Sequence, residues 1–413
     1  MTAYLLHGGR FLDPRQDELR EGVEVLIEGE RVKEVSDRSI KAASVVRIDV
    51  SGHTVMPGLI DAHIHFFLAE VNLGLLEGMP LTLLTTKAAA AARATLMRGF
   101  TTVRDAGGCD HGFKAAIDNG IVESPRVFIA GMPISQTGGH ADFRRRNQTS
   151  MECSCCSGLA YMSRIADGVP EMLRAVRDEL RKGADQIKLM VSGGVASQSD
   201  PLESLQFRAD EIEAAVEQAA SWRTYVMAHA YSADAIRRAV QCGVRTVEHG
   251  NLIDEPVARV MAERGAYIVP TLVTYERLRD RGPQYGLTPY SLEKNKIVLE
   301  AGLRSLEHCR AAGVPIGFGT DLLGPLQGDQ CREFIIRAAV MSPQEIIRSA
   351  TIVNAEILQR TGQLGEIVPG AFADLLVVDG DPYRDLGVFQ DQGARISVIM
   401  KNGTLYKNAL GAA

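Results

Sequence analysis

The sequence predicts a (β/α)8 barrel that carries a small β-sandwich built from both chain termini. In the middle of the chain, short apolar stretches alternate with Ala-, Glu- and Arg-rich stretches of helical spacing. Eight apolar stretches occur there, which is the strand number of a closed α/β barrel. Near both ends the pattern changes to short β-branched segments separated by glycines and polar residues, which is typical of antiparallel sheets.

The terminal segments are expected to form the sandwich, and the 413-residue chain is long enough for this unit and a barrel. The predicted boundaries place residues 1–55 and 363–413 in the sandwich and residues 56–362 in the barrel. Hairpins are predicted within 23–36 and 45–56. A further hairpin is predicted at the Asn402-Gly403 turn.

The barrel strands follow in chain order, each expected to be covered by the helices that come after it. The eight strands are expected at 58–65, 101–107, 126–135, 186–194, 225–230, 246–250, 267–272 and 316–321. Residues 169–183 and 209–222 are among the predicted helices, because their apolar residues recur at helical spacing.

Composition argues against several classes of protein. A net charge of −6 does not suit a protein that binds nucleic acid by neutralising phosphates. The chain has no apolar run of the ~18 residues that a membrane span needs and no basic segment of a secretory signal, so a cytoplasmic protein is expected. Seven scattered cysteines do not suggest a disulfide framework. The group Cys153, Cys155 and Cys156 lacks the spacing of a zinc site and is expected to be a loop with incidental thiols.

Side chains capable of catalysis gather at the C-terminal ends of the predicted strands, where such barrels carry their active sites. His63 and His65 lie two apart on the first strand and therefore point to the same side. A lone histidine at a strand end is more often structural, and a lone aspartate there can be a helix N-cap. The whole group nevertheless predicts a metal site, because it also includes His229, His249, Asp321 and Lys188.

Lys188 is unexpected inside a buried strand, because lysine is seldom buried without a partner. Its ammonium has no lone pair for a metal. A lysine deprotonated by its surroundings can react with carbon dioxide, and the resulting N-carboxylate can bridge two metals. The alternative is a lysine whose stem packs in the barrel while its charged end reaches the rim.

These residues and the motifs around them resemble the amidohydrolase superfamily. The motifs are "VMPGLIDAHIHFF" (55–67), "TVEHG" (246–250), "GFGTDLLG" (317–324) and "GEIVPGAFADLLVVDGDP" (365–382). The resemblance implies two divalent metal ions. It implies that one is held by His63, His65 and Asp321, that the other is held by His229 and His249, and that carboxylated Lys188 bridges them. Zn²⁺ is the expected metal, because imidazole, carboxylate and carbamate ligands suit it.

Shorter segments resemble the imidazolonepropionase-related dipeptidases, and most closely the prolidases: "TTVRDAGG" (101–108), "SQTGGHAD" (135–142), "KLMVSGGVAS" (188–197) and "AHAYS" (228–232). The expected activity is cleavage of the amide bond of Xaa-Pro dipeptides and N-acyl-proline by a hydroxide that bridges the metals. Asp321 is the expected general base and then acid. His140 is the expected donor to the tetrahedral oxyanion, and Tyr231 the expected ligand of the substrate carboxylate.

Other activities stay open at this point. The same branch contains carboxypeptidases that release Arg or Lys, and amidases that act on N-acyl aromatic amino acids such as ochratoxin. The predicted loop 273–290 mixes acidic and basic residues, which does not favour a cationic leaving residue. A deaminase of this fold usually has a glutamate where Ser232 stands, and a non-catalytic scaffold usually loses ligands that are all present here. A small-molecule substrate and a homo-oligomer are expected, with neither nucleic acid nor membrane as partner.

Overall fold

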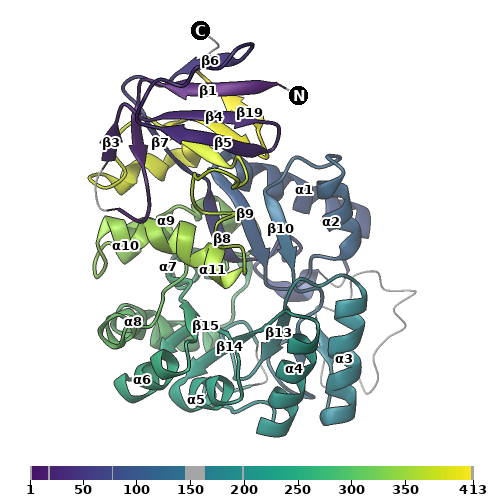
Figure 1. The fold of residues 1–413 in the computed structure, drawn as a ribbon. Helices are drawn as coiled ribbons and strands as arrows, with labels where there is room; N and C mark the ends of the chain where they lie inside the picture. The colour runs from purple at the N-terminus through teal and green to yellow at the C-terminus, as the bar shows by residue number, and fades with distance from the viewer. Residues whose placement is uncertain (1, 17–18, 77, 145–162, 198–199, 411–413) are drawn as a thin grey trace.

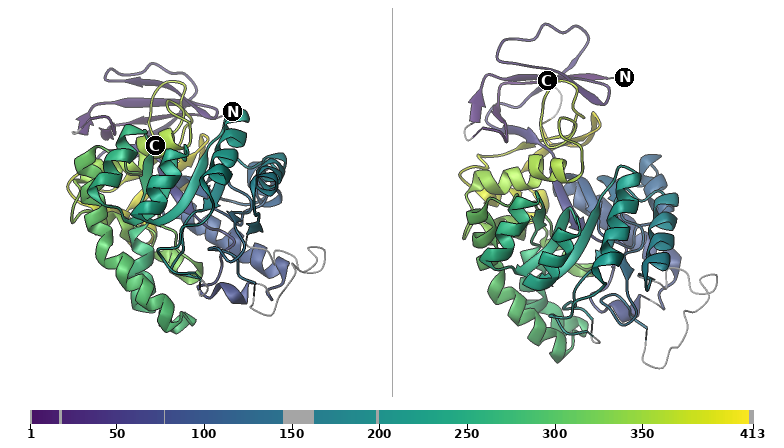
Figure 2. Two further views of the ribbon diagram at one scale, coloured as in Figure 1. Left: turned by 90° about the horizontal axis from the view of Figure 1, so that it is seen from below. Right: turned by 60° about the horizontal axis from the view of Figure 1, so that its bottom comes forward.

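The computed structural model describes residues 2–16, 19–76, 78–144, 163–197 and 200–410. The cysteine group 153–156 lies outside the described residues. The structure is an α/β fold in which parallel strands and their helices occupy one part of the molecule, while the first and last strands, β1 (Ala3–His7) and β19 (Thr404–Asn408), lie together at one end (Figures 1 and 2). In the described parts of the chain, no helix has the length and apolar character needed to cross a membrane.

The central strands form two parallel sheets. The first sheet contains, in spatial order, β10 (Arg126–Ile129), β9 (Phe100–Asp105) and β8 (Leu59–Ile64). The second contains β12 (Arg164–Ile165), β11 (Ile134–Ser135), β13 (Ile187–Met190), β14 (Val226–Ser232), β15 (Thr246–Leu252) and β16 (Tyr267–Val269). Every residue of β8, β9 and β13 is buried, as expected of parallel strands that are covered on both faces.

Helices follow the strands and cover them. They are α1 (Leu81–Met97), α2 (His111–Asp118), α3 (Val169–Arg181), α4 (Ala209–Ser221), α5 (Ala233–Gln241), α6 (Glu255–Glu263), α7 (Leu272–Arg281), α8 (Pro289–Ala312), α9 (Arg332–Arg337), α10 (Pro343–Arg348) and α11 (Asn354–Ile357). The predicted helices 169–183 and 209–222 are confirmed as α3 and α4. Each buries an apolar stripe against one large hydrophobic core that includes strand residues such as Ile187 and Val226.

Backbone hydrogen bonds connect the two parallel sheets at both of their edges. On one side, Asp185 N donates to Ile129 O over 2.7 Å. On the other side, Gly317 N donates to Ile268 O over 2.8 Å, and Ala62 N donates to Phe318 O over 2.8 Å. The segment 316–321 therefore lies between β16 and β8, where the eighth strand was expected.

The prediction of a regular eighth strand is wrong, because only Ile316 forms a β-bridge there. Phe318 N donates instead to Ser349 O and to the side chain of Asn354, so its ladder bond is lost. The predicted third strand is also divided, into β10 and β11. The break includes Gly131, which has a φ of 68°, and Pro133, which has no N–H to donate.

The predicted seventh strand ends three residues early, and the predicted loop 273–290 is largely helical. Strand β16 ends at Val269, and helix α7 begins at Leu272 after Thr271, which adopts a φ of 48°. A 3-10 turn and the start of α8 follow. The backbone changes direction at Thr271, and a helix begins directly after it. The pattern of apolar and polar residues does not indicate this change.

The terminal segments form two sheets that share one hydrophobic core. One sheet has the order β5 (Arg31–Ser36), β4 (Glu24–Glu28), β1 and β6 (Val46–Asp49). The other has the order β19, β18 (Ile396–Lys401), β17 (Leu375–Val378), β7 (Thr54–Pro57), β2 (Arg10–Leu12) and β3 (Leu19–Glu21). The two chain ends meet where β7 pairs antiparallel with β17, with Met56 opposite Leu376.

Two of the three predicted hairpins are confirmed. Strands β4 and β5 pair antiparallel, as do β18 and β19, whose Asn402 and Gly403 have φ values of 49° and 68°. The predicted hairpin within 45–56 is wrong. Strand β6 pairs with β1, whereas β7 pairs with β2 and β17, so the turn between them carries the chain from one sheet to the other.

Candidate metal centre

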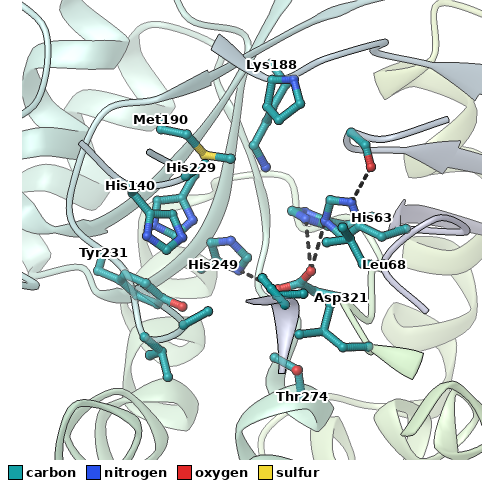
Figure 3. Close-up of a pocket in the computed structure, with 18 of the residues that line it drawn as sticks. His63, Leu68, His140, Lys188, Met190, His229, Tyr231, His249, Thr274 and Asp321 are labelled. Atoms are coloured by element: carbon teal, nitrogen blue, oxygen red, sulfur yellow. Dashed lines mark hydrogen bonds and ion pairs between the residues drawn. The ribbon is translucent and has the colours of Figure 1, made fainter. Parts of the chain in front are cut away.

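One pocket receives all the side chains for which the sequence predicts a catalytic, binding or ligating role (Figure 3). They come from separate elements: β8 carries His63, with His65 just beyond it, β13 carries Lys188, β14 carries His229 and Tyr231, and β15 carries His249. Asp321 comes from the segment after α8, and His140 from the connection after β11. Strand ends that are up to 258 positions apart in the sequence (63 to 321) thus meet at one place.

The carboxylate of Asp321 faces His63 on β8 and His65 just beyond this strand. Asp321 Oδ1 lies 3.1 Å from His65 Nε2 and 3.5 Å from His63 Nε2, and its Oδ2 lies 3.9 Å from His249 Nδ1. Ligand atoms of His63, His249 and Asp321 all lie within 4.8 Å of one another. This spacing is compact enough for a metal centre.

Hydrogen bonds outside the cluster leave one nitrogen of each imidazole free. Nδ1 of His63 lies 2.7 Å from Glu248 Oε2, and Nδ1 of His65 lies 2.8 Å from Gly107 O. These acceptors hold a proton on Nδ1, so Nε2 is the nitrogen that each ring turns toward Asp321.

The two histidines of β14 and β15 are held in the same way by neighbours. His249 Nδ1 lies 2.8 Å from the Thr271 hydroxyl, which leaves Nε2 free. In His229 the nitrogens are reversed, because Nε2 contacts Gly193 O at 3.1 Å and Nδ1 is left without that bond. Metal-ligating histidines are usually oriented by such outer contacts.

Burial keeps most of these groups in the form that binds a metal. Desolvation, with nearby positive charge, holds the pKa of His63 and His229 well below its usual value. Desolvation lowers the pKa of His249 to about 3. Burial opposes ionisation of Asp321 as well, but His63 and His65 outweigh it and keep the pKa of that carboxyl low. Burial also disfavours the charged form of His65, but its hydrogen bond with Asp321 outweighs burial and raises the pKa of His65. The neutral imidazoles of His63, His229 and His249 beside an ionised carboxylate are a suitable donor set for a divalent cation.

Lys188 reaches from β13 toward these histidines, and its side chain is only 1% exposed (Figure 3). Among the described residues, none lies within hydrogen-bond or ion-pair distance of its Nζ. Burial lowers the pKa of Lys188 to about 8. The amine is therefore much easier to deprotonate than an ordinary lysine, which is the condition for its reaction with carbon dioxide.

Three non-glycine residues around the cluster have left-handed backbone conformations: His249 with a φ of 73°, Asp321 with 49° and Thr271 with 48°. Such conformations cost about 1–3 kcal/mol each and persist only where the surroundings enforce them. The backbone of Asp321 is held because its N–H donates to His63 O over 2.8 Å. The strain is therefore concentrated at two of the candidate ligands and at Thr271, which contacts His249.

Sequence reasoning missed the buried carboxylate of Glu248. This side chain is fully buried and accepts hydrogen bonds from Arg104 Nη2 over 2.8 Å and Thr246 Oγ1 over 2.7 Å, besides its contact with His63. Its signal in the sequence was a glutamate inside an apolar strand, directly before His249. Arg104 was signalled in the same way, as an arginine inside the apolar strand β9.

His140 and Tyr231 line the pocket on the side of β14 (Figure 3). The His140 ring stacks on His229 with centroids 4.3 Å apart, and its Nδ1 lies 2.8 Å from Ser197 Oγ. The Tyr231 ring stacks on His249 at 5.2 Å. The Tyr231 hydroxyl lies 2.9 Å from that of Tyr275, a pocket residue that the sequence did not single out.

The rest of the lining is mainly apolar, with Leu68, Leu73, Phe143, Met190, Val195, Leu278 and Leu323. From the segment 273–290, Thr274, Tyr275 and Leu278 face the pocket. The charged residues of that segment do not line it. Glu276 accepts from Arg332 Nε over 2.9 Å, and Arg277 pairs with Asp280 at 3.1 Å.

Comparison with known proteins gives a consistent result. The model of the amidohydrolase family matches residues 54–406. A solved amidohydrolase structure is 52% identical, covers 98% of this chain and 99% of its own, and has a TM-score of 0.97. A prolidase solved with N-methylphosphonate-L-proline is 49% identical over 98% of this chain and 100% of its own, with a TM-score of 0.96. Ochratoxinase from Aspergillus niger is 32% identical over 380 residues, which are 86% of this chain and 75% of that protein.

Proposed function

The chain belongs to the amidohydrolase family of metal-dependent hydrolases, and from this premise we propose that it cleaves the amide bond of Xaa-Pro dipeptides and N-acyl-proline. The observation that carries the proposal is the single pocket in which the candidate metal ligands meet His140 and Tyr231. The 49% identity to a prolidase solved with a proline phosphonate supports proline as the leaving residue.

The proposal includes the architecture around this pocket. Residues 56–362 form a closed (β/α)8 barrel, and residues 1–55 and 363–413 form a β-sandwich domain. The backbone hydrogen bonds across both gaps between the parallel sheets support the closure. The core that the two terminal sheets share supports the sandwich.

Two divalent ions fit the donor set. We assign one ion to His63, His65 and Asp321, the other to His229 and His249, and carboxylated Lys188 to both. Nitrogen and oxygen donors of this kind suit Zn²⁺. When bound, the ions supply an activated water as nucleophile and polarise the scissile carbonyl.

The remaining steps belong to side chains of this pocket. Asp321 is ionised, so its carboxylate accepts the proton of the attacking water and then delivers it to the leaving nitrogen. His140 donates from Nε2 to the developing oxyanion when the Ser197 hydroxyl donates to Nδ1. The Tyr231 hydroxyl donates to the substrate carboxylate while Tyr275 holds it in place.

A second candidate is hydrolysis of N-acyl aromatic amino acids. The identity to ochratoxinase and the apolar lining of the pocket favour it. Release of Arg or Lys is less well supported, because Asp321 is the only acidic side chain in the described lining and it faces the histidines. Deamination also lacks support. The position where a deaminase of this fold usually has a glutamate is occupied by Ser232, whose side chain caps helix α5 by accepting a hydrogen bond from Ala235 N.

A substrate screen with Zn²⁺-loaded protein tests the proposal. It compares Xaa-Pro dipeptides and N-acyl-proline with Xaa-Arg dipeptides and N-acyl-phenylalanine, and measures kcat/KM. We expect the proline compounds to be the best substrates. Hydrolysis confined to N-acyl aromatic residues would replace the prolidase assignment with the second candidate, and purified protein with far less than one bound metal per chain would contradict the metal assignment. The homo-oligomer and the cytoplasmic location stay predictions.

A further inference from the structure

A buried lysine outside the pocket lining, Lys294 on α8, ties that helix to the connection between β13 and α4. Lys294 is only 4% exposed. Its Nζ donates to Gly194 O over 2.5 Å, Ser197 O over 2.6 Å and Asp200 O over 3.2 Å. An ammonium group has three hydrogens, so three carbonyl acceptors satisfy it completely. Burial of a charge is costly unless it is hydrogen-bonded, and these three charge-assisted bonds offset that cost and link the helix to the connection.

The three residues held by Lys294 are also the three that surround the His140 ring on one side. The ring lies so close to Gly194 that a Cβ there would come within 2.1 Å of His140 Cε1. Ser197 Oγ lies 2.8 Å from His140 Nδ1, and Asp200 Oδ2 lies 3.6 Å from the same atom. The position of His140 therefore depends on the segment that Lys294 holds.

Further bonds make this segment a closed unit. Asp200 Oδ2 accepts from Gly194 N over 3.1 Å and from Gln206 Nε2 over 3.2 Å. Gln206 Oε1 in turn accepts from the backbone N–H of His140 over 2.7 Å. Among the described residues of this unit, Lys294 is the only one that lies on a helix, and it anchors the unit to α8.

We propose that Lys294 is a positioning residue, which fixes the direction of the His140 imidazole through the carbonyls of Gly194, Ser197 and Asp200. The proposal rests on the proposed role of His140. Removal of the ammonium leaves three buried carbonyl groups without their donor, so the connection relaxes and Nδ1 of His140 loses its fixed partner. Misplacement of an oxyanion donor lowers kcat, whereas substrate binding by the rest of the pocket is retained.

The test compares Lys294→Met with the matched control Lys296→Met in the Zn²⁺-loaded enzyme. Lys296 lies on the same helix but is exposed and pairs with Glu300 at 3.9 Å. With alanyl-proline as substrate, we expect a decrease in kcat of about 10–100-fold for Lys294→Met, a change in KM of less than about 3-fold, and no change for Lys296→Met. His140→Asn should lower kcat at least as much, and the double variant should be no worse than His140→Asn alone.

A second readout does not depend on activity. Imidazole ¹H–¹⁵N spectra should show a displaced His140 signal in Lys294→Met and an unchanged one in Lys296→Met. If Lys294→Met does not fold, Lys294→Gln replaces it, because the amide still donates to the carbonyls and a smaller displacement is expected. An unchanged His140 signal in the folded variant, or full additivity in the double variant, overturns the inference. Failure of the proposed function looks different, because wild-type protein then leaves alanyl-proline intact or His140→Asn keeps full kcat.

Discussion

Replacement of Glu248 by glutamine tests whether the buried network under His63 prepares this histidine for a metal. The wild-type carboxylate accepts from Arg104, Thr246 and His63 Nδ1, and it is fully buried. A glutamine in the same place has one acceptor oxygen and one NH2 group. With its oxygen toward Arg104, it presents a donor to His63 Nδ1, so His63 must lose this bond or move its proton to Nε2.

Either outcome weakens metal binding, because Nε2 is the nitrogen that faces Asp321. Loss of an outer partner of a ligating histidine typically lowers metal affinity 10–100-fold, or about 1.4–2.7 kcal/mol. The assay is competition of the metal-free protein with a chelator of known Zn²⁺ affinity. Glu248→Gln protein that binds Zn²⁺ within about 3-fold of the wild type would refute this reasoning.

Stability must be separated from affinity, because Glu248 also balances a buried charge. Among the described residues it is the only carboxylate within ion-pair distance of Arg104, so its loss should destabilise the metal-free protein by about 3–5 kcal/mol. Glu333→Gln is a matched control. Glu333 pairs with Arg337 at 2.6 Å, both side chains are fully buried, and neither lines the metal pocket. The control should lose comparable stability and keep Zn²⁺ affinity.

Three further predictions concern the same pocket. Lys188→Ala should abolish activity and regain part of it with added short carboxylic acids; an active variant without them contradicts the bridging role. Because the pKa of Lys188 is lowered to about 8, its neutral fraction rises from roughly 10% at pH 7 to roughly 90% at pH 9. Metal loading of the metal-free protein at fixed dissolved CO2 should therefore accelerate about 10-fold and then level off, whereas an ordinary lysine gives no plateau in this range. Tyr231→Phe should raise KM for alanyl-proline about 10-fold, from loss of one hydrogen bond to a carboxylate, and Tyr275→Phe, the control that keeps this hydroxyl, should raise it less.

Local patterns in the sequence predicted the class of fold and the family correctly. Apolar strands that alternate with helical stretches gave an α/β arrangement with parallel strands, and the motifs around His63 and Asp321 led to the amidohydrolase family, which the family comparison confirms. These features are readable because strand and helix periodicities are local and because the C-terminal ends of parallel strands meet at one edge.

Other predictions were wrong where contacts between residues far apart in the sequence determine the backbone conformation. The segment 316–321 is not a regular strand, because Phe318 donates to Ser349 and Asn354. The segment 45–56 is not a hairpin, because its two strands join different sheets. The segment 273–290 is mostly helical, because the backbone changes direction at Thr271 and α7 begins at the next residue. Neither turn chemistry nor residue periodicity signals these choices.

The sequence by itself determined which residue types stand at the strand ends, and therefore that His63, His65, Lys188, His229, His249 and Asp321 are the candidate ligands. Only the tertiary structure decided how these side chains are oriented and supported. Glu248 meets His63 across 185 positions of the chain, and Lys294 meets Gly194 across 100. The physical reason is that a buried charge has a defined role only through its partners, and these partners become neighbours only when the chain has folded.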